Sequence, residues 1–224
     1  SGDLVDRARR RGARACERAL VPAPPRPEAA PSAETRAAID GLGERPLLVT
    51  VARLAPQKGL DLLCATAGLL TALPEARRPV WVVAGDGPLE GDLRRWVAEG
   101  DLPVRVLGRR EDVPDLLAAA DLVVSTARWE GQPLWVQEAL ALGAAVVATD
   151  VGGTREVTGE AARLLPAEPA VLAAAMLDLL ADERARTELQ GRARARALEL
   201  PDLRATLGQL DRLYRGEGSP RGSS

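Results

Sequence analysis

At 224 residues the chain has room for one ordinary α/β domain with trailing segments, and two compact domains would fit poorly. Hydrophobic residues make up 46% of the sequence but aromatic residues only 2%, with no Phe, so the core must consist of Ala, Val and Leu. Thirty basic and thirty-two acidic residues leave a net charge of −2, which excludes a global attraction for nucleic acid and restricts any anion site to a local feature.

The chain opens with a basic segment, residues 3–20, which is typical of a helix or a helix-turn. Its arginines are spread around the helix, which favours a solvated surface over a membrane contact. Prolines in residues 21–31 forbid regular structure, so this run is a linker or an extended crossover. We therefore expect a leading helix and linker at 1–30, one folded domain at 31–215 and a disordered tail at 216–224.

From residue 46 onward, short Val/Leu runs alternate with Ala/Leu-rich helical stretches, which indicates βα units and a parallel sheet. Six strands in this rhythm predict a doubly wound, Rossmann-like α/β sheet with ligands at the carboxyl ends of its strands. The predicted strands are 46–52, 79–85, 103–108, 120–126, 144–149 and 162–166. The predicted helices lie near 58–72, 88–99, 112–119, 132–142 and 153–158, followed by 168–181, 183–199 and 202–214.

The loop after the first predicted strand carries Arg53 and Lys58 and ends at Gly59, just inside a helix. An anion over the end of this strand would meet both cations and the positive end of the helix dipole. A surface Arg and Lys near a turn are also common without any ligand. This loop alone therefore leaves both interpretations open.

The strand predicted to end at Thr126 is followed by Glu130, Gly131 and a helix that begins at Pro133. Glu138 lies about two helical turns beyond Glu130 in the chain. Two carboxylates so placed suit the paired hydroxyls of a sugar or ribose, and Gly131 lets backbone approach a ligand closely. Acidic residues at a helix start also complement its dipole, and that alternative stays open at this point.

Two further loops are rich in glycine. Gly152-Gly153 stands at a predicted helix start, with Glu156 in the first turn, where exposed amides suit a phosphate or carboxylate as well as they suit a tight turn. Residues 85–91 begin like a dinucleotide fingerprint, but the third glycine falls at Gly91 instead of position 90. The broken pattern gives no support for nicotinamide or flavin binding.

Cysteine and histidine content points away from metal and redox chemistry. Cys16 and Cys64 stand in no metal-ligand or redox spacing, and the sequence contains no histidine, the commonest zinc ligand and general base. No apolar run approaches the roughly 20 residues that span a bilayer, and the Ser-Gly start does not resemble a signal peptide. We therefore expect a reduced, cytoplasmic protein without a metal.

The order and spacing of these loops carry a family resemblance. The stretches concerned are VARLAPQKGLDLL, VVAGDGPLEGDL and VLGRREDVPDLLAAADLVVSTARWEGQPLWVQEALALGAAVVATDVGGTREV. They include the E-x7-E pair Glu130/Glu138 and resemble the donor half of retaining glycosyltransferases of family 4, over roughly residues 46–198. The resemblance implies the C-terminal half of a GT-B fold, with residues 1–30 contributing the last helix of an N-terminal acceptor domain and the linker.

The resemblance also implies roles for individual residues. The expected catalytic residues are Arg53 and Lys58, which would hold the diphosphate and stabilise its developing charge, and Glu130, which would contact the donor sugar. Glu138 would bind the ribose hydroxyls. The other expected donor-binding residues are Gly131, Gln132 and Leu134 near the phosphate or sugar, and Gly108 and Arg109 beside the base.

The sequence departs from the family pattern in two places. Gln132-Pro133 stands where an aromatic residue and Gly are common, and Pro133 has no backbone N–H to donate to a phosphate. The run VPAPPRP replaces the usual Asn-Gly after the linking strand. The first departure affects the number of phosphate-facing amides, and the second affects the hinge geometry.

The resemblance implies an enzyme that transfers a glycosyl unit from a nucleotide sugar with retention, without metal, the leaving diphosphate acting as base. Its acceptor-binding half is absent here, so we expect this chain alone to bind donor without transferring sugar. Any peripheral membrane contact would be made through that absent half. Two alternatives stay open: the donor half of a nucleotide-sugar epimerase, and a non-catalytic nucleotide-binding module.

Overall fold

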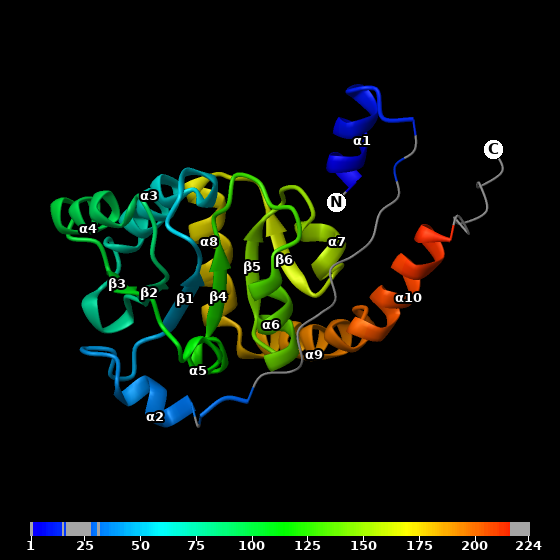
Figure 1. The fold of residues 1–224 in the computed structure, drawn as a ribbon. Helices are drawn as coiled ribbons and strands as arrows, with labels where there is room; N and C mark the ends of the chain where they lie inside the picture. The colour runs from blue at the N-terminus through cyan, green and yellow to red at the C-terminus, as the bar shows by residue number, and fades with distance from the viewer. Residues whose placement is uncertain (1, 15, 17–27, 31, 216–224) are drawn as a thin grey trace.

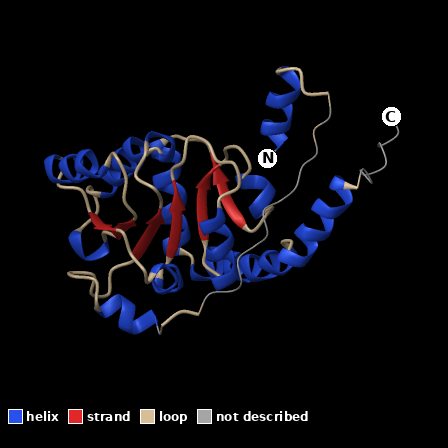
Figure 2. Ribbon diagram, viewed as in Figure 1, coloured by secondary structure: helices blue, strands red, loops and turns tan. Residues whose placement is uncertain are grey.

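The computed structural model of the chain describes residues 2–14, 16, 28–30 and 32–215. Six parallel strands form one sheet in the order β3-β2-β1-β4-β5-β6, with helices on both faces (Figures 1 and 2). The strands are β1 Leu47–Val51, β2 Val80–Ala84, β3 Val104–Gly108, β4 Leu122–Ser125, β5 Val146–Thr149 and β6 Ala162–Leu165. The predicted doubly wound α/β sheet is confirmed, and each strand lies within its predicted range.

The helices from α3 onward match the predicted ranges to within two residues at each end. They are α3 Leu60–Leu70, α4 Glu90–Glu99, α5 Val113–Ala119, α6 Leu134–Leu142, α7 Thr154–Thr158, α8 Pro169–Ala181, α9 Glu183–Glu199 and α10 Leu203–Tyr214. Two short 3-10 helices, η1 Pro56–Lys58 and η2 Glu75–Arg77, interrupt the loops before α3 and β2. The hydrophobic periodicity of the sequence therefore placed almost every element of the domain.

Helices shield both faces of the sheet, which is why its inner strands are continuous apolar runs. Every residue of β2, β4 and β5 is buried. One core layer joins the sheet to α5 and α6 through residues such as Leu117 and Leu140. The other joins it to α3 and α8 through residues such as Leu63 and Met176. The helix layers fix the strand ends, and so the loops, in space.

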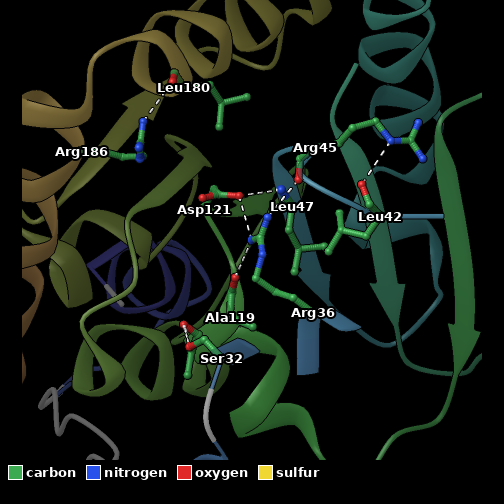
Figure 3. A network of polar contacts seen from close by, with 10 residues as sticks. Ser32, Arg36, Leu42, Arg45, Leu47, Ala119, Asp121, Leu180 and Arg186 are labelled. Carbon is green, nitrogen blue, oxygen red and sulfur yellow. Dashed lines mark hydrogen bonds and ion pairs between the residues drawn. The ribbon is translucent and has the colours of Figure 1, made fainter. Parts of the chain in front are cut away.

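A short helix that the sequence did not reveal, α2 Ser32–Ala37, is tied to the amino end of β1. The Arg36 guanidinium donates to the Asp121 carboxylate at 3.0 Å and to the carbonyls of Ala119 at 3.1 Å and Arg45 at 2.9 Å (Figure 3). Asp121 also accepts from the Leu47 amide at 2.7 Å. This network lies at the edge of the sheet opposite the carboxyl ends of the strands.

The two ends of the described chain extend beyond the sheet (Figure 1). The leading helix α1 Gly2–Arg10 lies beside α7, where the Gly2 amide donates to the Glu156 carboxylate at 2.5 Å. Helix α10 projects away from the sheet and exposes Leu203 and Leu207. Within the described residues, no helix has the length and apolar character needed to cross a bilayer. The predicted tail, 216–224, and most of the proline-rich run lie outside the described residues.

Candidate functional site

The loops that follow β1, β4 and β5 meet at the carboxyl edge of the sheet, where the strand order reverses between β1 and β4. The amide of Arg128 donates to the Gln57 carbonyl at 2.8 Å, and the Thr126 hydroxyl donates to the Lys58 carbonyl at 3.0 Å. The Thr149 hydroxyl in turn donates to the carbonyl of Ala127 at 2.6 Å. These bonds hold three loops together at the position where doubly wound sheets bind ligands.

An ion pair between Lys58 and Glu130 occupies the centre of these loops. The Lys58 Nζ lies 2.5 Å from the Glu130 Oε1, and the two side chains are only 13% and 7% exposed. Among the described residues, every other ion pair is more exposed, the next being Arg36–Asp121 at 26% and 29%. The family resemblance implied that both residues act on one donor, and the structure brings the two side chains into direct contact.

Two glycines let the loops approach closely enough for this contact. Gly59 has φ +60°, and a Cβ there would overlap the carbonyl oxygen of Thr126. Gly152 has φ +53°, and a Cβ there would overlap the carbonyl oxygen of Glu130. That carbonyl also accepts from the Gly153 amide at 2.9 Å. Larger residues at either glycine would force the loops apart, because both the conformation and the space exclude a side chain.

Arg53 lies two residues beyond the end of β1 and is exposed. The loop that contains Arg53 is held to the loop after β2, because the Leu54 amide donates to the Asp86 carbonyl at 2.7 Å. Among the described residues, the Arg53 guanidinium has no hydrogen bond or ion pair with Lys58, Glu130 or any other group. Its five donors are therefore available to an anion at the strand end.

Glu138 lies on α6, half-buried, and burial raises the pKa of its carboxyl above the ordinary value. Within the described part of the chain, this carboxyl has no hydrogen-bond or ion-pair partner. It does not join the Lys58–Glu130 pair. A half-buried carboxyl without a partner is costly and is suited to accepting hydrogen bonds from a ligand.

The remaining predicted residues occupy two places at the same edge. At the end of β3, Gly108 has φ +69° and Arg109 is exposed. At the start of α6, Gly131 faces open space, Gln132 is half-buried and Leu134 is 45% exposed. Both places have exposed surface that a ligand could contact.

The start of α6 bears on the number of amides that could face a phosphate. Pro133 stands directly before Leu134, and no side chain caps the helix there. The amides of the first turn are thus not occupied by a cap, although Pro133 contributes none. Helix starts of this kind suit an anion.

Sequence reasoning missed the two threonines that join the loops. Thr126 and Thr149 are each 1% exposed and stand at the carboxyl ends of predicted strands. A polar residue at the end of an otherwise apolar strand was the available signal, because its buried hydroxyl must find an acceptor. Here both acceptors are loop carbonyls, so the hydroxyls fix loop positions.

The sequence profile described as Glycosyl transferases group 1 matches residues 45–182, which contain the whole loop cluster and all six strands. The chain belongs to this family of glycosyltransferases. The matched region includes all of the loops that form the site, because Lys58, Glu130 and Glu138 all fall inside it.

Curated relatives are similar over part of their length. The lipopolysaccharide core biosynthesis mannosyltransferase LpsB of Rhizobium meliloti is 43% identical over 117 residues, which cover 48% of this chain and 32% of LpsB. The GDP-mannose-dependent alpha-(1-6)-phosphatidylinositol monomannoside mannosyltransferase of Mycolicibacterium smegmatis is 33% identical over 162 residues, covering 64% of this chain and 41% of that protein. The matched segments thus span less than half the length of these relatives.

Solved structures place the glycosyltransferase chain in the GT-B fold. Anabaena Alr3699/HepE in complex with UDP-glucose superposes with a TM-score of 0.72 and 25% identity, over 83% of this chain and 52% of HepE. Sucrose-phosphate synthase of Thermosynechococcus elongatus gives a TM-score of 0.69 and 25% identity, over 84% and 49%. The chain therefore spans about half the length of each of these proteins and corresponds to a C-terminal-type domain.

Proposed function

We propose that this chain is the donor-binding half of a retaining glycosyltransferase that transfers a glycosyl unit from a nucleoside diphosphate sugar to an acceptor held by another domain. The observation that carries the proposal is the buried Lys58–Glu130 pair at the point where the strand order reverses. Family membership and the UDP-glucose complex of HepE support it. The GDP-mannose-dependent relative supports the same donor class.

The cations act on the diphosphate in this proposal. Lys58 and Arg53 hold its oxygens, and their charge stabilises the negative charge that grows as the glycosidic bond breaks. The helix start at Gly131 to Leu134 adds backbone amides aimed at the same group. Because two side-chain cations supply this charge, donor binding and transfer are proposed to proceed without a divalent metal.

The carboxylates act on the hydroxyls. Glu130 accepts hydrogen bonds from the donor sugar, and Glu138 accepts them from the ribose. Gly108 and Arg109 lie beside the base, at the end of β3. A donor so placed would run along the carboxyl ends of β3, β2, β1 and β4, the edge at which the loops after β1 and β4 meet.

Retention requires that the acceptor oxygen bond to the anomeric carbon on the face from which the diphosphate departs, and the departing diphosphate is proposed to take the acceptor proton. The acceptor and its binding groups belong to a second domain, so this chain alone is proposed to bind donor without transferring sugar. We place the protein in the cytoplasm, where nucleotide sugars are the donors for such transfer.

Calorimetry with UDP, GDP and ADP, each in EDTA, tests the proposal. One of the three is expected to bind, and Lys58→Ala and Arg53→Ala are each expected to weaken that binding about tenfold or more, because each removes a charge-assisted contact. Arg128→Ala removes an exposed cation from the same edge and is the matched control, with an expected change below twofold. Unchanged affinity in the Lys58→Ala/Arg53→Ala double variant would refute the phosphate site.

A further inference from the structure

Lys58 and Glu130 are each other's partner in the ion pair. In the described part of the chain, neither side chain has a hydrogen-bond or ion-pair partner other than the opposite member of the pair. The proposed donor needs both of them, the ammonium for its diphosphate and the carboxylate for its sugar. Donor binding must therefore change the partners of both groups.

The main chain on either side of the pair is fixed, so the change falls on the side chains. The Glu130 carbonyl accepts from the Gly153 amide at 2.9 Å, and the Lys58 carbonyl accepts from the Thr126 hydroxyl at 3.0 Å. Gly59 and Gly152 leave no space between these loops. The long, flexible Lys58 stem can redirect its ammonium without any movement of this scaffold.

The two possible ligands make different demands on Glu130. A nucleoside diphosphate that draws Lys58 away leaves a carboxylate only 7% exposed beside a second anion with no donor to replace the ammonium. Such an unpaired buried charge is strongly unfavourable. A nucleotide sugar draws Lys58 away equally but brings hydroxyl donors to the vacated carboxylate. Glu130 therefore penalises the free diphosphate more than the intact donor.

We propose that Lys58 exchanges Glu130 for the diphosphate when the donor binds, and that Glu130 thereby makes the site prefer the intact nucleotide sugar over the nucleoside diphosphate product. The inference rests on the proposed function of this site. Once the sugar has left, Glu130 recaptures Lys58, which weakens the hold on the diphosphate. The ion pair thus favours product release with no moving lid.

The residue type at position 58 fits an exchange. Lys58 is the only lysine of the sequence, whereas 29 of its 30 basic residues are arginines. An arginine fork would bind both carboxylate oxygens of Glu130 at once, while an ammonium is a compact charge that can be passed from one anion to another. A chain that otherwise uses arginine has the more easily transferred cation at this one position.

Affinity ratios test the exchange. Calorimetry compares UDP with UDP-glucose, and GDP with GDP-mannose, for the wild type, Glu130→Gln and the control Asp61→Asn. Asp61 pairs with Arg128 in an exposed contact at the same edge, so the control removes an equal charge outside the pair. In Glu130→Gln the free diphosphate is expected to bind several-fold more tightly, and the preference for the sugar-bearing ligand to fall about tenfold. The control should keep the wild-type ratio.

The outcomes separate this inference from the proposed function. If the wild type binds none of these nucleotides, both are overturned. If binding depends on Lys58 but Glu130→Gln keeps the wild-type ratio, the exchange is wrong and the donor site stands. A fall in the ratio in both Glu130→Gln and Asp61→Asn also overturns the exchange, because it would then reflect net charge alone.

A second measurement uses only the wild-type fold, so it does not depend on any variant folding. Because Lys58 is the sole lysine, protein labelled with 13C and 15N lysine gives one side-chain spin system in an NMR spectrum. Saturating nucleotide sugar is expected to shift the Lys58 ε and ζ signals as the ammonium changes partner. Unmoved signals at saturation, with binding shown by calorimetry, would overturn the exchange.

Discussion

The hydroxyl of Thr126 donates to the main-chain carbonyl of Lys58 at 3.0 Å, so the residue that follows β4 fixes the loop that follows β1. The Thr126 side chain is itself buried, at 1% exposure. Its role is to position Lys58, since it reaches the loop main chain and no charged group. Loops held before a ligand arrives lose less conformational entropy on binding.

Replacement of Thr126 by Val keeps the shape but removes the donor, leaving the Lys58 carbonyl without this bond. We expect Thr126→Val to lower the free energy of unfolding by about 1–2 kcal/mol. We also expect a several-fold weaker affinity for the nucleoside diphosphate that the wild type binds. Thr126→Ser restores the hydroxyl and should recover the affinity. An affinity equal to that of the wild type in Thr126→Val would mean that Lys58 needs no such support.

Gly59 directly precedes α3 and packs closely against the main-chain carbonyl of Thr126. Gly59→Ala combines a φ of +60° with steric overlap on a backbone atom, and we expect it to lower the free energy of unfolding by about 2 kcal/mol or more. Gly191→Ala, at an open position within α9, is the control and should be neutral or raise stability by up to about 1 kcal/mol. Urea unfolding of both variants gives the comparison.

The sequence predicted the sheet and the loop charges because each depends on local pattern. Buried parallel strands leave continuous apolar runs, and the family resemblance assigned Lys58 and Glu130 to one donor site. Helix α2 was missed because it is a six-residue helix with no buried residue, held by the Arg36–Asp121 contact 85 positions apart. A short helix held by polar contacts with distant parts of the chain carries no hydrophobic periodicity to detect.

The sequence also could not predict which charged side chains would form ion pairs, because pairing depends on contacts between loops that are distant in sequence. Arg53 and Lys58 stand five positions apart and look equivalent as cations, yet Lys58 is buried against Glu130 while Arg53 is exposed. The two glutamates likewise differ, because only Glu130 has an ion-pair partner among the described residues. Burial and pairing depend on how the loops pack across the sheet edge, and Gly59, Gly152 and the two threonines determine that packing.

Gln137 on α6 is a polar residue in a nearly fully buried position. It is 1% exposed, and within the described residues neither of its amide atoms has a hydrogen-bond partner. Replacement by Met keeps the length and removes the unsatisfied groups, so we expect Gln137→Met to raise the free energy of unfolding by about 1–2 kcal/mol. Thermal unfolding checks the change, and no gain in stability would mean that the amide has a partner after all. Gln137→Ala, which opens a cavity instead, should be destabilising.

Glu138 links stability, pH and binding in one residue. Burial raises the pKa of its carboxyl in the folded domain above 4.5, the ordinary value that it keeps when the chain unfolds. Below pH 4.5 the group is protonated in both states and costs nothing. As the pH rises from 4.5 through the folded pKa, the unfolded state ionises more readily, so the domain loses stability and the loss is complete above that pKa.

Glu138→Gln removes this loss and provides the test. We expect the variant to be more stable than the wild type at pH 7, with the difference vanishing as the pH falls below 4.5, because only the ionised carboxyl is penalised. Nucleoside diphosphate affinity should change in the opposite direction, falling in the variant because an amide is a weaker acceptor for ribose hydroxyls. Thermal unfolding and calorimetry across this pH range measure both quantities. A variant that is less stable at pH 7 and binds as well as the wild type would show that Glu138 has a structural role and lies outside the donor site.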